Sequence, residues 1–164
     1  MAGRDRELTL RFLAQPTDVN YGGKVHGGAV MKWIDQAGYA AAVAWSGHYS
    51  VTVAVGGIRF LAPIRISDLV TLQAKLVHTG TSSMHFVVEV RARDPKDPAS
   101  GDRLCTHCVI VFVALDAPEG RPVPVPPWTP ADEEDVRLAG YAQQVMALSR
   151  GIEPMLEQIA RQGA

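Results

Sequence analysis

One segment limits the possible folds of this chain more than any other: HGGAVMKWIDQAGYAAAVAW, residues 26 to 45. It reads as a helix that is apolar almost all round, and such a helix is normally buried. Two glycines stand near its start and one carboxylate, Asp35, near its middle. A buried carboxylate is costly unless another group pairs with it or the protein uses it. The segment therefore predicts a central buried helix and singles out Asp35 as a candidate functional residue.

Five further segments have the character of β-strands: residues 7 to 14, 50 to 63, 69 to 78, 84 to 93 and 103 to 116. The third and fourth alternate apolar and polar residues, which predicts two half-buried strands in a long antiparallel hairpin. The fifth is apolar on both faces, so we expect it to be central or covered by another layer. Gly56 and Gly57 interrupt the second and predict a bulge or a close approach of another backbone.

The last part of the chain has a different composition. Residues 118 to 130 are rich in proline and predict an extended connector. Thr129 is a candidate N-cap with Pro130 at the first helical position, which predicts a helix to about Arg150. A shorter helix is expected after Pro154. We therefore divide the chain into a domain of residues 1–117 and a connector with a helical tail, residues 118–164.

This order of elements predicts an α+β fold in which a curved antiparallel sheet wraps around one long central helix, with a C-terminal helical extension. The chain of 164 residues is 47% hydrophobic and 20% charged, as expected of one globular domain. Its formal net charge of −1 provides no basic field for nucleic acid, so no such partner is expected. Apolar runs are too short to cross a membrane, and the N-terminus lacks a secretory signal, so we expect a cytoplasmic protein without a membrane partner.

Cys105 and Cys108 form a C-x-x-C pair, which in other contexts binds zinc or performs redox chemistry. Here they lie in a predicted strand, where residues three apart point to opposite faces. No second cysteine pair or spaced histidine pair completes a tetrahedral site. We therefore interpret both as reduced packing residues and expect no metal site.

The stretch P-T-D-V-N-Y-G-G-K-V-H-G-G followed by M-K-W-I-D-Q-A-G resembles the signature of the hotdog acyl-CoA thioesterases. The resemblance extends from about residue 8 to residue 116 and includes the R-F-L-A-P and G-T-S-S stretches. It implies the hotdog fold and hydrolysis of acyl-CoA to a free acid and coenzyme A, which is part of the substrate, so that no separate cofactor is expected. It also implies that the loop asparagine and the helix carboxylate meet across a dimer interface, in a homodimer or a hexamer built from three dimers.

The residues themselves support this chemistry. Gly27 and Gly28 stand where the helix begins, and the first amides of a helix are unpaired donors at the positive end of its dipole. A thioester carbonyl held there would have its developing oxyanion stabilised. Asp35 is two turns further along the same face and can act as a general base or as a nucleophile; the sequence does not separate the two. The structural alternatives are a tight Gly-Gly turn and a surface ion pair of Asp35 with Lys32.

Two more residues are candidates for the catalytic site. Asn20 precedes the helix and can orient a water or hold the carbonyl, although Asx-turn chemistry is its ordinary role. His26 is a secondary candidate, because a histidine at a helix start is as often a cap.

The phosphates of coenzyme A require donors or cations. Candidates from the resemblance and from charge are a turn and four arginines: Thr79, Gly80, Thr81, Ser82, Ser83, Arg59, Arg65, Arg91 and Arg93. Each arginine is otherwise an ordinary surface charge.

Two other functions compete with hydrolysis. A hotdog hydratase or dehydratase needs a histidine paired with the carboxylate, and His26 is the one near it in sequence. A non-catalytic acyl-CoA-binding protein would keep the pocket without needing Asp35. Because a lone hotdog sheet has an open edge, we also expect two copies to pair along the strand from Val51 to Leu61.

Overall fold

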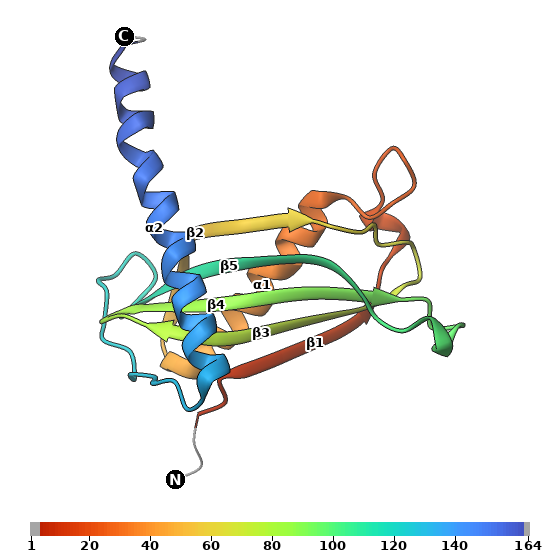
Figure 1. Cartoon of the computed structure of the whole chain (residues 1–164), viewed down its shortest axis with the longest axis horizontal. Coiled ribbons are helices and arrows are strands. Elements are labelled where there is room, and N and C mark those ends of the chain that lie inside the picture. Colours follow the sequence, from red (N-terminus) through yellow and green to blue (C-terminus); the bar gives the residue numbers. More distant parts are fainter. Residues whose placement is uncertain (1–3, 163–164) are drawn as a thin grey trace.

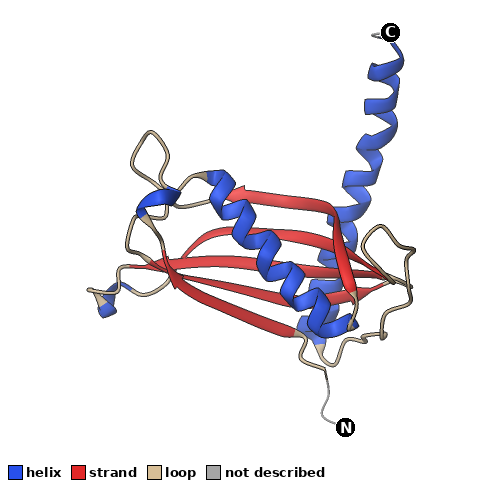
Figure 2. Ribbon diagram, turned by 180° about the vertical axis from the view of Figure 1, so that it is seen from behind, coloured by secondary structure: helices blue, strands red, loops and turns tan. Residues whose placement is uncertain are grey.

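The computed structural model describes residues 4–162. Its five strands form one antiparallel sheet in the order β1-β3-β4-β5-β2, so that β1 and β2 are the two edges. The strands are β1 (Glu7–Leu13), β2 (Tyr49–Phe60), β3 (Leu69–Thr79), β4 (Ser83–Arg93) and β5 (Arg103–Leu115). Helix α1 (Gly27–Ser46) lies across one face of this curved sheet, and α2 (Glu133–Gln162) covers part of the other (Figures 1 and 2). This is the α+β hotdog arrangement predicted from the sequence.

The side of α1 that faces the sheet forms the centre of the hydrophobic core. Ile34, Ala37 and Ala42 are almost fully buried against the inward side chains of the strands. Gly38 is needed here, because a Cβ atom at this position would lie 2.6 Å from the Phe112 ring. The opposite side of α1, which carries Asp35, is exposed in the single chain. The prediction of a helix buried all round is therefore wrong for the isolated chain.

The predicted hairpin and central strand are confirmed. Strands β3 and β4 pair antiparallel, and β5 lies between β4 and β2 with buried side chains on both faces. Cys105 and Cys108 are both free and buried, as expected of packing residues. They share one core cluster rather than opposite faces, because a register shift between β4 and β5 breaks the alternation next to Cys105. Burial raises the pKa of the Cys108 thiol to about 12, which leaves it protonated and unreactive.

The C-terminal helix differs from the prediction at both ends. It begins at Glu133 rather than at Pro130, and the Asp132 carboxylate accepts a hydrogen bond from the Asp135 amide at 2.8 Å. Asp132 is therefore the N-cap in place of Thr129. The helix then continues without a break through Pro154 to Gln162. Because Pro154 lies in a fully exposed stretch, the carbonyl that loses its amide partner there is open to water.

The first half of α2 forms a second hydrophobic layer. Ala142 and Met146 pack on Val77, Val109 and Val111 of the outer sheet face. The helix start is fixed by Arg6, which donates to the buried carboxylate of Asp135 at 2.7 Å. That ion pair lowers the pKa of Asp135 to about 2.

The connector before α2 also packs against the sheet and α1. Val125 is buried in the main core, and the Trp45 indole donates to the Pro126 carbonyl at 2.9 Å. The proposed division of the chain at residue 117 remains a prediction, but the two parts share extensive apolar surface.

Of the two features predicted at Gly56 and Gly57, the bulge is confirmed, whereas the atoms that come close belong to side chains and not to another backbone. The register of β2 with β5 shifts between Gly56 and Arg59, which is a bulge. A Cβ atom on Gly56 would lie 2.7 Å from the side chains of Val145 and Met146, so α2 crosses the edge strand at this point. Neither α1 nor α2 has an apolar stretch long enough to span a membrane over the residues described.

Candidate functional site

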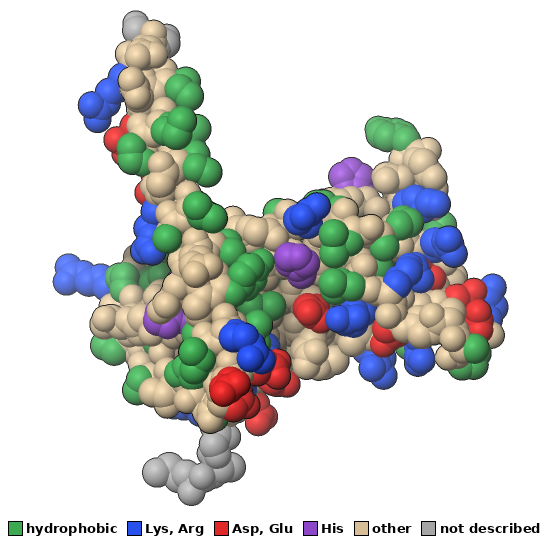
Figure 3. Space-filling model, in the orientation of Figure 1, with side chains coloured by type: hydrophobic (Ala, Val, Ile, Leu, Met, Phe, Trp, Pro, Cys, Tyr) green, Lys and Arg blue, Asp and Glu red, His purple; other side chains and the backbone are tan. Residues whose placement is uncertain are grey.

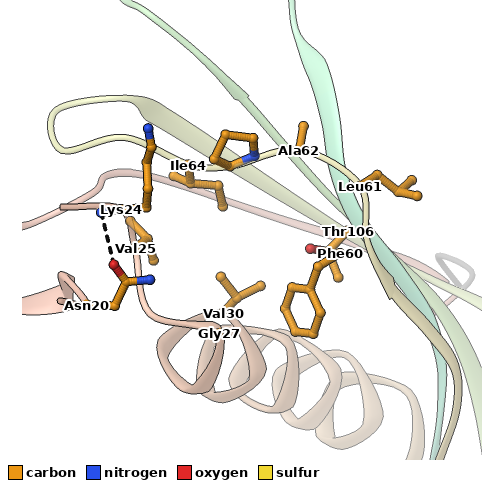
Figure 4. Close-up of a pocket in the computed structure, with 11 residues that line it drawn as sticks. Asn20, Lys24, Val25, Gly27, Val30, Phe60, Leu61, Ala62, Ile64 and Thr106 are labelled. Atoms are coloured by element: carbon orange, nitrogen blue, oxygen red, sulfur yellow. Dashed lines mark hydrogen bonds between the residues drawn. The ribbon is translucent and has the colours of Figure 1, made fainter. Parts of the chain in front are cut away.

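A cavity of about 400 Å³ opens at the start of α1, between the loop that precedes this helix and the chain that follows β2 (Figure 4). Its walls are mostly apolar, with a few polar groups, as is usual for small-molecule sites. The lining residues are Asn20, Lys24, Val25, Gly27, Val30, Phe60, Leu61, Ala62, Pro63, Ile64 and Thr106. The structure thus brings two of the predicted site residues, Asn20 and Gly27, to one cavity.

The amide side chain of Asn20 has a fixed orientation. Its Oδ1 accepts from the backbone amides of Gly22 at 2.9 Å and Lys24 at 3.2 Å. Because an oxygen must accept these two bonds, the Nδ2 group is left as a donor, and it points into the cavity (Figure 4). The Asx-type turn and a functional role are therefore compatible: the turn holds the donor in place.

The two glycines at the helix start do not have equivalent amides. His26 is the N-cap of α1, and its Nδ1 accepts from the Gly28 amide at 2.9 Å. The Gly27 amide has no acceptor among the described residues, and this residue lines the cavity. Gly27 is consequently the available donor, at the positive end of the helix dipole.

Asp35 lies outside this cavity. Eight residues separate it from Gly27, which corresponds to about 12 Å along the helix axis. Its Oδ1 accepts a hydrogen bond from the Thr52 hydroxyl on the edge strand β2. Among the described residues it forms no ion pair with Lys32 and none with a histidine. Within residues 4–162 of the single chain, neither the surface ion pair considered above nor the dyad of a hydratase is formed.

Exposed apolar side chains surround Asp35 and continue along β2. Val53 on this edge strand is 54% exposed, and the rings of Tyr39 and Tyr49 meet edge to face with centroids 6.2 Å apart. Phe60 and Leu61 extend the apolar surface to the cavity. The free edge thus connects the region of Asp35 with the region of Asn20.

The candidates for coenzyme A binding fall into two groups in the single chain. Arg59, Arg65, Arg91 and Arg93 lie toward the end of the sheet that bears the cavity. Two of them have acidic partners, since Arg91 pairs with Glu89 at 2.9 Å and Arg93 with Asp102 at 3.6 Å. The turn from Thr79 to Ser83 lies at the opposite end of the sheet (Figure 1).

The interior of this turn is already hydrogen bonded. The Gly80 amide donates to the Ser83 carbonyl, and the carbonyls of Thr81 and Ser82 accept from Val125 and Ala114. The Thr79 hydroxyl accepts from the Trp128 amide at 3.0 Å. These bonds make the turn rigid and connect it to the proline-rich segment.

Two residues in this region were not predicted from the sequence. Thr52 is one of several threonines in strands, and its position beside Asp35 depends on the packing of β2 against α1. Lys24 lines the cavity and has no acidic partner among the described residues, but a lysine in a polar loop carries no signal of its own. Within residues 4–162, no group of three His, Cys, Asp or Glu side chains is arranged to hold a metal ion.

Comparison with known proteins gives a consistent set of relatives. Residues 22–99 match the family model of the thioesterase superfamily. The acyl-CoA thioester hydrolase YciA of Salmonella typhimurium is 36% identical over 121 residues, which are 73% of this chain and 90% of that protein.

Solved structures are similar over still more of the chain. One is the acyl-CoA hydrolase from Staphylococcus aureus, in complex with butyryl coenzyme A, coenzyme A and coenzyme A disulfide. It has a TM-score of 0.83 at 27% identity, and the match covers 96% of this chain and 94% of that chain. Another is the hexameric thioesterase from Yersinia pestis, with a TM-score of 0.65 at 34% identity; this match covers 71% of this chain and 93% of that chain.

Three mutant structures of the Staphylococcus aureus enzyme carry alanine in place of an asparagine, an aspartate and a threonine. There the aspartate follows the asparagine by 15 positions, and the threonine follows the aspartate by 17.

Proposed function

We infer that this chain, which belongs to the acyl-CoA thioester hydrolases of the thioesterase superfamily, hydrolyses acyl-CoA at a site made of Asn20, the Gly27 amide and Asp35. The products are a free carboxylic acid and coenzyme A. The observation that carries the site assignment is the pair of donors at one cavity, the Asn20 amide group and the Gly27 amide.

These two donors suit the carbonyl oxygen of a thioester. As the carbonyl carbon is attacked, negative charge collects on this oxygen, and two fixed donors near a helix N-terminus stabilise it. Neither donor has to reorganise, because Oδ1 of Asn20 is fixed by two backbone amides and Gly27 belongs to the helix. His26 caps the helix and so helps to hold the Gly27 amide in position.

Asp35 supplies the second half of the chemistry. As a general base it would take a proton from water as the water attacks the carbonyl carbon, and then return a proton to the departing sulfur of coenzyme A. As a nucleophile it would attack the carbonyl carbon, break the C–S bond with release of the coenzyme A thiolate, and form a mixed anhydride that water cleaves to the free acid and the Asp35 carboxylate. Thr52 donates to Oδ1 and so fixes which carboxylate oxygen is free.

The spacing of these residues supports the assignment. Asn20, Asp35 and Thr52 are separated by the same 15 and 17 positions as the three residues replaced in the Staphylococcus aureus enzyme. Thr52 thus joins Asn20 and Asp35, which the sequence had singled out, as a residue of the proposed site.

The distance along α1 favours a site shared by two chains. Asp35 is about 12 Å from Gly27 along the axis, too far to act on a carbonyl bound at the Gly27 amide of the same chain. Pairing of two copies along β2 would cover the exposed edge and bring Asn20 of one copy to Asp35 of the other. The hexameric relative from Yersinia pestis supports assembly of such dimers into a hexamer.

The coenzyme A moiety would also contact both copies. In one chain the turn from Thr79 to Ser83 and the four candidate arginines lie at opposite ends of the sheet. If two copies pair antiparallel along β2, their sheets run in opposite directions. The turn from Thr79 to Ser83 of one copy would then lie at the same end of the dimer as the four candidate arginines of the other copy. Arg59 and Arg65, which form no ion pair among the described residues, are the more available phosphate partners, and Lys24 joins them at the cavity.

The test is a comparison of wild type with Asp35→Asn, which keeps the shape and removes the basic oxygen. Release of free coenzyme A from a medium-chain acyl-CoA, followed with a thiol reagent, should fall by about two to four orders of magnitude in kcat. Asn20→Ala should slow hydrolysis less, because orienting the carbonyl contributes less than providing the base. Calorimetric binding of a non-hydrolysable analogue should persist in Asp35→Asn.

Lys32→Gln is the matched control, since it changes a charge on the same helix three residues earlier. It should keep wild-type turnover. Equal turnover in wild type and Asp35→Asn, with both proteins folded, would show that Asp35 is not the catalytic carboxylate.

A further inference from the structure

The C-terminal part of α2 is largely uncovered by its own chain. The helix crosses the edge strand β2 near Gly56 and then extends beyond the sheet (Figure 1). Every residue from 150 to 162 is exposed. A helix of this kind in water normally has a polar surface all round, unless another molecule covers part of it.

The surface of this helix is instead strongly asymmetric. Large apolar side chains gather on one side of the projecting part (Figure 3), where Leu148 is 74% exposed and Ile159 is 65% exposed. They belong to a series with alternating spacings of four and three, here called the α2 stripe: Tyr141, Val145, Leu148, Ile152, Met155 and Ile159. Gln143, Arg150 and Glu157 occupy the opposite side.

The α2 stripe has the heptad pattern of a helix that pairs with another helix. One set of positions holds the β-branched residues Val145, Ile152 and Ile159. The alternate set holds Tyr141, Leu148 and Met155. Together the two sets form a continuous apolar seam, and in a pair of helices each side chain of such a seam inserts between four side chains of the partner.

Tyr141 and Val145, at the start of the α2 stripe, already pack against Gly56 and Gly57 of their own chain. We propose that the exposed remainder of the α2 stripe, from Leu148 to Ile159, pairs with the same segment of a second copy of this chain. A symmetric dimer contact uses the same patch on both partners, and the α2 stripe is apolar throughout, so it complements itself. Its exposed side chains, together with the adjacent Leu156, offer on the order of 100 Å² each, and two copies would bury roughly 1,000 Å², where specific interfaces begin.

Charge favours a protein partner over a membrane surface. The residues from 150 to 162 carry two arginines and two glutamates, which balance: Arg150, Arg161, Glu153 and Glu157. A helix that lies on anionic lipid is typically rich in Lys and Arg on its polar side. Arg161 and Glu157 instead pair with each other at 3.7 Å, one turn apart.

The contact is also continuous with the free edge of the sheet. Because α2 leaves the sheet at Gly56, the α2 stripe begins beside the strand proposed above as the dimer seam. The α2 contact lies apart from the proposed catalytic residues and does not depend on them.

The test uses the full chain with Ile152→Glu and Ile159→Glu together. Both residues are exposed and seven positions apart, so the fold of the sheet should be unaffected. Sedimentation equilibrium over a dilution series should show self-association weakened by at least about a hundredfold, because four charges would face one another in each helix pair. The control, Ala147→Glu with Pro154→Glu, adds two charges at the same spacing away from the α2 stripe and should associate like wild type.

Identical association of wild type and the Ile152 and Ile159 variant would overturn the proposal. So would flotation of wild type, but not of this variant, with vesicles of phosphatidylcholine and phosphatidylglycerol, because lipid would then be the occupant. Acyl-CoA hydrolysis by the same samples reports the proposed function separately. A wild type without activity would contradict the thioesterase site and leave the association result intact.

Discussion

Asp35 is exposed on α1 and accepts a hydrogen bond from the Thr52 hydroxyl on β2. The sequence pattern, a single carboxylate in an apolar helix, singles out this residue as a candidate, and its functional role remains a proposal. Its exposure was not predictable, because the pattern of α1 does not distinguish burial by the sheet from burial by a second copy. Thr52 carried no signal, since it becomes a partner of Asp35 only when β2 lies beside the helix.

Thr52→Val should separate positioning from catalysis. Valine keeps the shape and the strand preference but removes the donor to Asp35. Loss of one hydrogen bond to a charged group predicts a fall in kcat of about tenfold to a hundredfold with little change in KM. Steady-state kinetics of Thr52→Val and of Thr52→Ser, which keeps the hydroxyl, measure this. A similar loss in both variants would mean that the hydroxyl is not what matters.

At the scale of elements, the strands, α1 and the Gly56-Gly57 bulge were predictable, because alternation and glycine placement reflect local geometry. The extent of α2 was not. Pro154 normally ends a helix, yet α2 continues, and its N-cap is Asp132 rather than Thr129. General residue preferences do not determine either end, because Asp132 caps the helix through the Asp135 amide and Pro154 lies where its lost backbone bond is exposed to water.

The crossing of α2 over β2 can be tested with one methyl group. In Gly56→Ala the new Cβ would lie 2.7 Å from side-chain atoms of Val145 and Met146, so these side chains, or the helix that carries them, must move. We expect a loss of about 1–3 kcal/mol in the free energy of unfolding. Gly140 lies on α2, and no atom is within 4 Å of a Cβ at this position. Gly140→Ala should therefore raise the free energy of unfolding by about 0.5–1 kcal/mol. Urea denaturation of both variants measures the contrast, and equal effects would contradict the close approach.

A histidine on the sheet face that α2 covers leads us to expect that the folded protein is less stable in acid. His85 on β4 has a buried Nδ1 without a partner among the described residues, and burial, with nearby His78 and Arg150, lowers its pKa to about 4. In the unfolded chain a histidine titrates near 6.5, so as the pH falls the unfolded chain binds this proton before the folded chain does. The free energy of unfolding therefore decreases between about pH 6.5 and pH 4. Asp135, with its pKa near 2, adds a loss only below about pH 4.

Thermal melts of wild type and His85→Gln at about pH 7 and about pH 5 measure this effect. Wild type should lose several degrees in Tm on this change, and His85→Gln should lose less, because the group that takes up the proton is gone. Parallel shifts in the two proteins would place the acid sensitivity elsewhere.

At the scale of the whole molecule, the chain has features that a single copy does not use. The edge strand β2 is free, the side of α1 with Asp35 is exposed, and Asn20 lies at a cavity that Asp35 does not reach. In the proposed dimer the residues that cover these surfaces would come from another copy, so no pattern within one chain predicts which residues meet. The open edge was expected on physical grounds, and its consequence for catalysis can be measured directly.

The measurement is complementation between two inactive variants. Asn20→Ala lacks the donor and Asp35→Asn lacks the carboxylate, so each should be slow alone. If the site joins Asn20 of one copy to Asp35 of the other, a mixed dimer contains one intact site and one doubly altered site. After subunit exchange in an equal mixture, half of the dimers are mixed, and turnover should rise to about a quarter of the wild-type value. Sites within one chain predict no recovery, because every chain in the mixture then carries a defective site. Mixing Asp35→Asn with itself under the same exchange conditions controls for gains caused by the treatment, and recovery well above that control would establish the shared site.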